Sequence, residues 1–162
     1  MIGALVAQRR VRSTYTALNA RDLDGFLASW SEDATFTFPG DVPASGTWRG
    51  KAEIRAWFAG FLDRFPELHF DLRRVCVARP LALGASNDLA AHWEIALTNR
   101  EGVSNRNSGI TLIEVRGGKV VAARDFIAST GDDFRRVWGE AQDGGPPATA
   151  RRGRSSGATG SG

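Results

Sequence analysis

The sequence contains few of the residues that build metal sites or cross-links. Among its 162 residues there is one cysteine, Cys76, and there are two histidines, His69 and His92. A lone cysteine excludes an internal disulfide and a cysteine-based zinc site, and neither histidine has a ligand partner at zinc-site spacing. No glycine-rich loop joins a strand to a helix in the way that nucleotide phosphates require. We therefore expect a protein that uses no metal and no other cofactor.

Long hydrophobic runs and strong charge are also missing. No segment approaches the ~18 consecutive apolar residues of a membrane-spanning helix. The apolar stretch over residues 1–7 is too short for a secretion signal and is followed at once by arginines. The net charge is only +3, and the basic residues are scattered among acids, whereas nucleic-acid binding needs a clustered basic face. These features predict a soluble, cytoplasmic protein that binds neither nucleic acid nor a membrane.

The chain does contain enough apolar residues for one core. Hydrophobic residues make up 42% of it, and its length favours a single domain. Residues 143–147 read Asp-Gly-Gly-Pro-Pro, and the segment beyond them is rich in glycine, serine, alanine and arginine. Such a segment has little to bury. We expect a folded domain over residues 1–138 and a disordered tail over residues 139–162.

Two helices are expected at the start of the domain. The first covers about residues 3–20, where apolar residues recur on one face. The second begins after Asp22, whose side chain can cap backbone N–H groups, and carries an apolar stripe that reaches Trp30. The alternation over residues 34–38 predicts a strand, and residues 41–49 resemble a polar loop.

The third helix has the clearest apolar stripe of the chain and is expected over residues 51–65, with Gly50 at its start. Strands follow, separated by turn residues, and Gly117-Gly118 suits a tight hairpin. Asp132 is a candidate cap for a short closing helix. The expected strands cover residues 68–79, 88–99, 106–116 and 119–129.

Helices followed by a run of antiparallel strands predict an α+β fold with the helices on one face of the sheet. Aromatic-rich helices cannot all bury their stripes against each other, so the sheet must curve around them, and this geometry leaves an apolar cavity at the open end. The candidate lining residues for an apolar small molecule are Trp30, Phe38, Trp48, Trp57, Phe58 and Phe61, with Asn107 and Thr111 as polar contacts. For each aromatic residue taken alone, a place in the core is the simpler interpretation.

Four segments resemble the nuclear transport factor 2-like superfamily, and within it the SnoaL-like polyketide cyclases and the ketosteroid isomerases. Residues 15–25 resemble its first helix–turn–helix, 33–36 its first strand, 45–54 the entry to its third helix, and 117–126 its last hairpin. The resemblance covers about residues 5–128. It implies a cone-shaped, curved, mixed but mostly antiparallel sheet wrapped around three N-terminal helices, the cystatin-like fold. It also implies a homodimer formed through the exposed sheet face.

The resemblance suggests roles for two residues. Asp125 lies on the last strand, where SnoaL-like cyclases keep an acid, and apolar walls would raise its pKa toward the working pH. The alternative is an exposed carboxylate paired with a neighbouring arginine. Tyr15 lies where ketosteroid isomerases place an oxyanion-binding tyrosine, although it could equally be a core residue. The position of the isomerase base falls on Phe38, which cannot move a proton. The second oxyanion acid falls near Ile110 or Thr111 and is also missing.

His92 and Glu94 are two residues apart on one expected strand, so their side chains share a face. Limonene epoxide hydrolase-like enzymes carry an Arg-x-Asp pair on this strand, and the His-x-Glu pair could form a proton relay with Asp125. The alternative is that both side chains face water, because Trp93 and its apolar neighbours occupy the other face.

The leading hypothesis is an enzyme that catalyses cyclisation, isomerisation or dehydration of an apolar carbonyl compound of polyketide or terpenoid type. Asp125 would be the general acid or base, Tyr15 the oxyanion donor, and His92 a relay or orienting group. No cofactor is needed, because the carbonyl itself accepts the electrons. The fold does not decide function, so two alternatives remain. One is a non-catalytic ligand-binding or dimerisation module, and the other is epoxide opening, which requires Asp125, His92 and Glu94 to point at one water.

Overall fold

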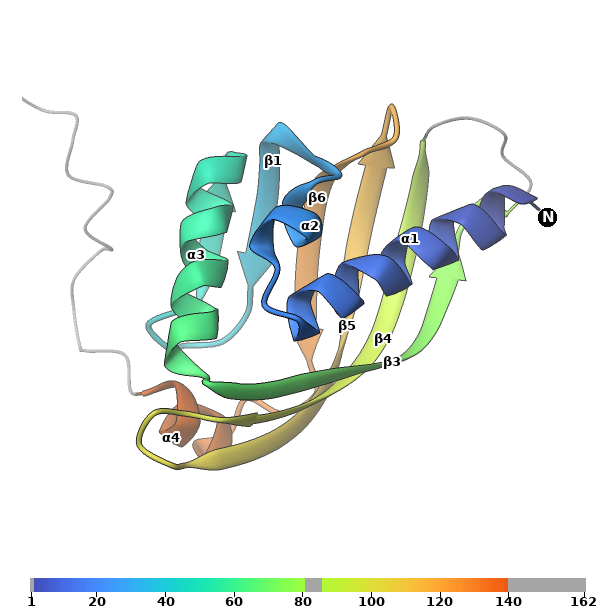
Figure 1. Ribbon diagram of the computed structural model, residues 1–162. Coiled ribbons are helices and arrows are strands. Elements are labelled where there is room, and N and C mark those ends of the chain that lie inside the picture. Colours follow the sequence, from blue (N-terminus) through green and yellow to red (C-terminus); the bar gives the residue numbers. More distant parts are fainter. Residues whose placement is uncertain (1, 81–85, 140–162) are drawn as a thin grey trace, which may run out of the picture.

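A curved sheet covered by helices on one face makes up the described part of the chain (Figure 1). The computed structural model describes residues 2–80 and 86–139. The helices there are α1 (Ile2–Asn19), α2 (Leu23–Leu27), α3 (Lys51–Arg64) and α4 (Asp132–Trp138). The strands are β1 (Trp30–Phe38), β2 (Gly46–Arg49), β3 (Glu67–Val77), β4 (Asn87–Thr98), β5 (Ser104–Arg116) and β6 (Lys119–Ile127). Apart from residue 139, the expected tail lies outside the described residues.

The sheet has the strand order β2-β1-β6-β5-β4-β3. Every neighbouring pair is antiparallel except β1 and β6, which run parallel. The long helices α1 and α3 cross the same face of the sheet, with α2 between them (Figure 1). The expected α+β fold with a curved, mostly antiparallel sheet is therefore confirmed. Within the described residues, no helix is long and apolar enough to span a membrane.

Helix α1 is fixed to the edge strand β3 by the side chain of its last residue and by one in its first half. The amide of Asn19 donates to the Phe70 carbonyl and accepts from the Phe70 N–H, both at 2.8 Å. Nearer the start of the helix, the Gln8 amide donates to the Val75 carbonyl at 3.2 Å. These bonds hold the helix across the sheet and thereby set the position of Tyr15.

Of the two expected helix caps, one is confirmed and the other is wrong. Asp22 does cap α2, because its side chain accepts the N–H of Gly25 at 2.9 Å. Asp132 does not cap α4. Gly131 is the N-cap, and Asp132 is the first helical residue, whose carboxylate pairs with Arg135 at 3.1 Å. An acidic side chain in the first turn still interacts favourably with the positive end of the helix dipole.

The second helix is shorter than its apolar stripe predicts. It ends at Leu27, and Trp30 already belongs to β1, where it is paired with Val120 of the parallel neighbour β6. The segment expected to be a polar loop contains β2, whose Trp48 lies opposite Phe36 of β1. In both places pairing with another strand overrides the local pattern.

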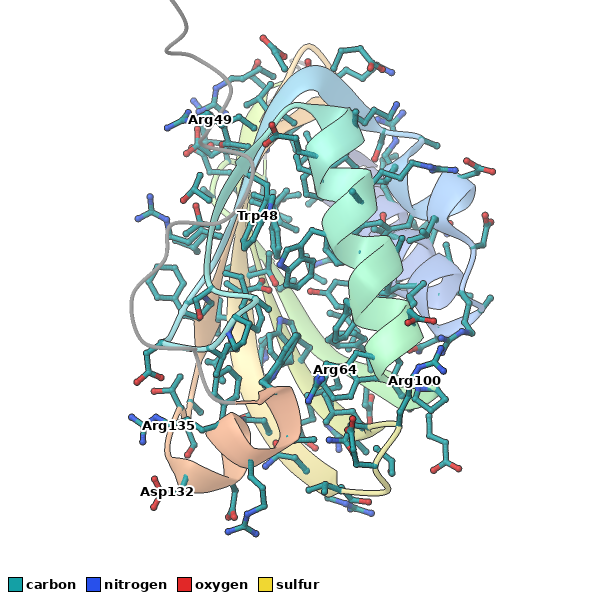
Figure 2. The ribbon with its side chains drawn as sticks, turned by 90° about the vertical axis from the view of Figure 1, so that its left-hand side faces the viewer. Trp48, Arg49, Arg64, Arg100, Asp132 and Arg135 are labelled. Atoms are coloured by element: carbon teal, nitrogen blue, oxygen red, sulfur yellow. The ribbon has the colours of Figure 1, made fainter. Side chains whose placement is uncertain are left out.

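Aromatic side chains of α3 and α4 close one end of the domain. Trp138 of α4 packs on Phe61 of α3 and on Phe65, the C-cap of that helix, with ring centroids 5.6 and 4.8 Å apart. Arg64, at the end of α3, donates to the Val137 carbonyl at 3.1 and 3.0 Å. Figure 2 shows Arg64 between the end of α3 and α4. The last helix is therefore attached by both packing and hydrogen bonds.

Gly109 allows a large side chain to lie across the sheet. It is the cross-strand neighbour of Trp93, and a Cβ atom at Gly109 would lie 2.5 Å from Trp93 Cζ2 and 2.6 Å from the Phe126 carbonyl oxygen. The absence of a side chain on β5 at this point thus leaves room for the indole ring on the concave face.

We predict that Gly109→Ala lowers the free energy of unfolding by about 1–3 kcal/mol, because overpacking forces the indole or the backbone to move. Gly60→Ala is the matched control. Gly60 lies exposed within α3 with no atom within 4 Å of a new Cβ, so helix propensity should raise stability by up to ~1 kcal/mol. Urea unfolding of the two variants measures both effects. Equal stability of the two variants would contradict the close approach of Trp93 to β5.

Candidate active site

An apolar cavity of about 520 Å³ lies between α1 and the concave face of the sheet. Its polar groups are few, and the charged residues in its wall are Arg10 and Asp125. This volume and composition suit a small organic molecule of low polarity. The apolar wall includes Val11, Leu18, Phe26, Trp30, Phe36, Phe58, Phe70, Leu89 and Trp93.

Three side chains from three elements meet at the hydroxyl of Thr111, on β5. Its Oγ1 lies 2.6 Å from Asp125 Oδ1 on β6 and 3.1 Å from the Tyr15 hydroxyl on α1. The indole N–H of Trp93, on β4, donates to the same oxygen at 2.9 Å. Asp125 is the direct cross-strand neighbour of Thr111, so pairing of β5 with β6 places both side chains on the concave face.

The directions of these hydrogen bonds follow from the number of hydrogens available. A threonine hydroxyl has one hydrogen and two lone pairs, an indole N–H only donates, and an ionised carboxylate only accepts. With Asp125 ionised, Thr111 donates to Asp125 and accepts from Trp93. Its remaining lone pair accepts the hydrogen of Tyr15. Every polar hydrogen of the cluster is then donated in a hydrogen bond, and this is the one assignment of donors and acceptors that satisfies all four side chains.

The environment alters the acidity of two of these groups. Burial raises the pKa of Asp125 to about 7, against the opposing effect of the hydrogen bond from Thr111. Burial also raises the pKa of Tyr15 well above its ordinary value, and the negative charge of Asp125 adds to this, while the hydrogen bond with Thr111 acts in the opposite direction. Near neutral pH the cavity therefore holds a carboxyl group that can both take and give a proton, beside a phenol that remains a hydrogen-bond donor.

Residues 11–123 match the SnoaL-like domain family, which is more than half of the chain. The chain belongs to the SnoaL-like family. No curated protein is similar enough in sequence to match it.

Solved structures with a similar fold match most of this SnoaL-like chain. Bal32a, from a soil-derived mobile gene cassette, is 18% identical with a TM-score of 0.71, and the match covers 81% of this chain and 95% of Bal32a. A protein of unknown function with a cystatin-like fold from Xanthomonas campestris is 24% identical with a TM-score of 0.65, covering 82% and 97%. TerC, co-crystallised with polyporic acid, is 17% identical with a TM-score of 0.61, covering 74% and 88%. At these identities the likeness shows the fold alone.

Of the candidate lining residues, only three lie in the wall of this cavity, and they are Trp30, Phe58 and Thr111. A smaller hollow of about 40 Å³ shares Phe58 and Asp125 with the main cavity and is lined by other candidates. These other candidates are Phe38, Trp57, Phe61 and Asn107. Asn107 also donates to the Ser129 carbonyl at 2.7 Å.

Trp48 lines neither space. Its ring lies 6.3 Å from Phe36 and 5.6 Å from Trp57 between centroids, and Figure 2 shows it on β2 beside α3. Trp48 is therefore a packing residue between the edge of the sheet and α3, and the prediction that it contacts a ligand in this cavity is wrong.

The expected relay of Glu94, His92 and Asp125 is not formed. His92 and Glu94 are exposed on the outer face of β4, whereas the cavity faces Trp93. Glu94 instead pairs with Arg73 at 2.7 Å, and the hydrogen bond from Arg73 lowers the pKa of the carboxyl. Epoxide opening required these three side chains to reach one water, so this arrangement removes that alternative.

Trp93 lines the cavity, although the sequence analysis placed it only on an apolar strand face. The alternation along β4 already indicated that this face is buried. Residues 91, 93, 95 and 97 of β4 are buried and alternate with exposed ones, which identifies the inner face of the strand. Thr111 was taken for a weak polar contact, and no local pattern indicated that three side chains would converge on it. Within residues 2–80 and 86–139, no cluster of three His, Cys, Asp or Glu side chains is arranged to hold a metal.

The raised pKa of Asp125 predicts a loss of stability with rising pH. Its carboxyl holds its proton up to about pH 7 in the folded chain, but only to about pH 4 in the unfolded chain. The contribution of Asp125 to the free energy of unfolding is therefore greatest below about pH 4. It falls by up to ~1.4 kcal/mol per pH unit between the pKa of the unfolded chain and that of the folded chain, and it is constant at higher pH. Urea unfolding from pH 4 to 8 should show this slope in the wild type relative to Asp125→Asn, in which nothing ionises at this position.

Thr111 variants test the cause of this behaviour. Thr111→Val removes the hydrogen bond that opposes the shift, so the pKa of Asp125 should rise further, whereas Thr111→Ser should retain the wild-type value. Carboxyl ¹³C chemical shifts follow the titration directly. An Asp125 that titrates near pH 4 in the wild type would show that its carboxyl is solvated.

Proposed function

We propose that this SnoaL-like domain catalyses proton transfer on an apolar carbonyl compound, as a step of cyclisation, isomerisation or dehydration. The observation that carries the proposal is the pair formed by Asp125 and Tyr15. Both are anchored to one hydroxyl, that of Thr111, in the wall of an apolar cavity. One is a carboxyl group that titrates near neutrality, and the other is a phenol that stays protonated.

The separation of the two groups suits a ketone and its α-carbon. Asp125 Oδ1 and the Tyr15 oxygen lie 2.6 and 3.1 Å from the same atom, so they are no farther apart than the sum of these distances. The α-hydrogen of a ketone is three bonds from its carbonyl oxygen. A ketone in the cavity can therefore present its oxygen to Tyr15 and its α-hydrogen to the carboxylate at the same time.

The reaction begins when the Asp125 carboxylate takes the α-proton. The electrons of the C–H bond form a carbon–carbon double bond, and those of the C=O π bond move to the oxygen. The Tyr15 hydroxyl turns its one hydrogen from Thr111 to this oxygen and donates a hydrogen bond to the developing charge. The carboxylic acid formed can return its proton to another carbon, which isomerises the substrate. It can instead protonate a leaving hydroxyl, which dehydrates it. A carboxyl with a pKa of about 7 is effective in both directions near neutral pH.

The apolar wall contributes in two ways. It excludes water, which strengthens the hydrogen bond to the enolate oxygen, and it keeps the pKa of Asp125 high enough for the carboxyl to act as a base. The co-crystal of TerC with polyporic acid supports the use of this fold to hold a small organic molecule.

We predict that the protein exchanges the α-hydrogens of α-tetralone, a bicyclic apolar ketone, for deuterium in D₂O. Asp125→Asn should lower the rate by ~10²–10⁴-fold because the base is lost. Tyr15→Phe should lower it by up to ~10²–10³-fold because the oxyanion donor is lost. Proton NMR follows the exchange. His92→Asn and Glu94→Gln are the matched controls and should keep the wild-type rate, because both side chains lie on the outer face.

This experiment also separates the proposal from the binding-module alternative. Binding is measured independently by the change in tryptophan fluorescence, since Trp30 and Trp93 line the cavity. Binding of α-tetralone without exchange above the Asp125→Asn level would favour a non-catalytic module and contradict the enzyme proposal.

We further propose that the chain forms a homodimer through the outer face of β5 and β6. Ile110, Leu112 and Phe126 are exposed there by 43, 46 and 49%, and Ile110 is paired directly with Phe126. Three exposed large apolar side chains on adjacent strands form a patch of the kind that interfaces cover.

We predict a dimer mass in sedimentation at micromolar concentration, and a shift to monomer for Leu112→Glu, which places a charge within the patch. Leu5→Glu is the control, because Leu5 is as exposed but lies on α1, far from the patch in the fold. A wild-type protein that sediments as a monomer would remove the homodimer proposal.

A further inference from the structure

One basic side chain, that of Arg10, lies at the mouth of the cavity, and the contacts described above give its guanidinium no acidic partner. Arg10, on α1, is exposed and belongs to the cavity wall, and its Nη1 lies 3.9 Å from the position of a Cβ at Gly118. The guanidinium therefore lies between the helix and the turn that joins β5 to β6. Val6, 45% exposed on the same helix, lies beside it in the wall.

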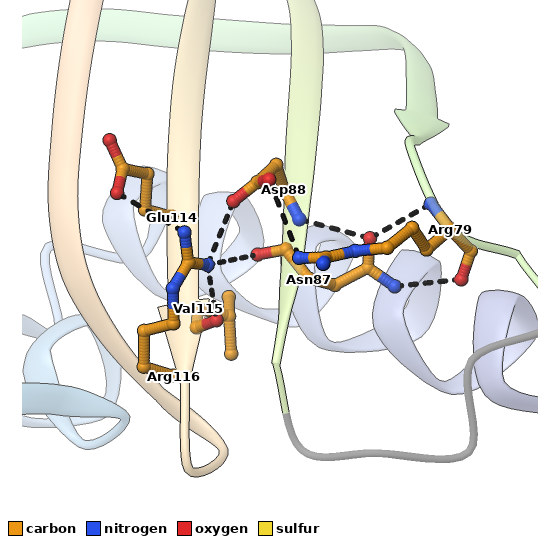
Figure 3. Close-up of polar contacts among 6 residues, drawn as sticks. All are labelled: Arg79, Asn87, Asp88, Glu114, Val115 and Arg116. Atoms are coloured by element: carbon orange, nitrogen blue, oxygen red, sulfur yellow. Dashed lines mark hydrogen bonds and ion pairs between the residues drawn. The ribbon is translucent and has the colours of Figure 1, made fainter.

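Asp88 on β4 and Glu114 on β5, at this end of the sheet, are already paired, and they face away from the cavity. Asp88 accepts from Arg116 at 2.8 Å and from Arg79 at 3.5 Å, and Glu114 accepts from Arg116 at 3.5 Å (Figure 3). All lie on the outer face of the sheet, because Asn87 and Val115, next to them along the strands, line the cavity. Among the hydrogen bonds and ion pairs of residues 2–80 and 86–139, none uses the Arg10 guanidinium.

The same network gives the mouth a defined edge. The Asn87 side chain accepts from the Arg79 N–H at 3.1 Å and donates to the Arg79 carbonyl at 2.9 Å, and Arg116 donates to the Asn87 and Val115 carbonyls at 3.3 and 2.8 Å (Figure 3). The ends of β4 and β5 are therefore held in place opposite α1. An arginine above this edge faces any group of a ligand that extends out of the cavity.

We infer that the substrate carries a carboxylate at the end remote from its reacting carbonyl, and that Arg10 binds this carboxylate at the mouth. The inference rests on the proposed function for the position of the carbonyl. Arg10 precedes Tyr15 by five residues, a rise of about 7.5 Å along the helix. A molecule whose ketone contacts Tyr15 therefore reaches Arg10 with its far end, across an apolar body that fits the wall between them.

A carboxylate fits this position better than a phosphate. The planar guanidinium matches a carboxylate through two parallel hydrogen bonds. A phosphate monoester carries nearly two negative charges, and Arg10 is the sole cation in the described wall of the cavity. The substrate class is thus an apolar keto acid.

The test compares α-tetralone with a carboxylated α-tetralone of the same ring system, with binding measured by tryptophan fluorescence. Arg10→Gln should weaken binding of the carboxylated ketone by about tenfold, as expected for the loss of a charge-assisted hydrogen-bonded pair, and should leave binding of the neutral ketone unchanged. Arg10→Lys should lose less, because the charge is kept. Arg9→Gln is the matched control, because Arg9 is an exposed neighbour outside the cavity wall, and it should alter neither affinity.

The outcomes separate this inference from the proposed function, because fluorescence reports binding without turnover. A loss of affinity in Arg10→Gln that is equal for both ketones, or absent for both, would overturn the role of Arg10. Deuterium exchange on the neutral ketone tests catalysis by Asp125 whichever result is obtained. The wild type should bind the carboxylated ketone more tightly than the neutral one. A decrease of this affinity with added salt in the wild type, and not in Arg10→Gln, would support the charge pairing.

Discussion

The site depends on one unfavourable arrangement, a carboxyl group enclosed by apolar walls without a cation beside it. An ionised carboxylate removed from water is costly unless hydrogen bonds or opposite charges compensate. Asp125 receives one hydrogen bond, from Thr111, and the nearest positive group in the wall is at the mouth of the cavity. The compensation is incomplete, so the proton is held to about pH 7. Burial in the same apolar surroundings also raises the pKa of Tyr15, and the negative charge of Asp125 adds to this effect, so Tyr15 keeps its proton.

The side chains around the Thr111 hydroxyl are positioned by residues that lie far from Thr111 in the chain or on other elements. Asn19 and Gln8 fix α1 on the edge strand β3, which brings Tyr15 over the middle of the sheet. Gly109 leaves the space in which the Trp93 ring lies, and the indole N–H then occupies one lone pair of Thr111. The threonine hydrogen goes to the ionised carboxylate, because a carboxylate only accepts. Packing at a glycine thus places one of the three partners of the Thr111 hydroxyl.

Several local patterns were sufficient to predict local structure. The stripe of α3 and the Gly117-Gly118 turn were placed correctly, and Asp22 caps the helix that it was expected to cap. The failures have a common cause. Trp30 and Trp48 were assigned to a helix and to a loop, yet both lie in strands, where Trp30 pairs with Val120 of β6 and Trp48 with Phe36 of β1. Hydrogen bonding to those partners outweighs local propensity, and a single chain segment carries no record of which partner it will have.

By itself the sequence predicted the apolar stripe of α3 and the apolar alternation around Trp93, because the periods of helix and strand display these directly. It also identified the family resemblance, and through it Asp125 and Tyr15. Only the tertiary structure decided that His92 and Glu94 point away from the cavity and that Thr111 joins three side chains. Tyr15 and Thr111 are separated by 96 positions, and their hydroxyls meet because α1 crosses a curved sheet. Apolar residues line the cavity and also fill the core, so the two kinds of position show the same pattern in the sequence. Only the distances between the packed elements distinguish a cavity wall from a filled core.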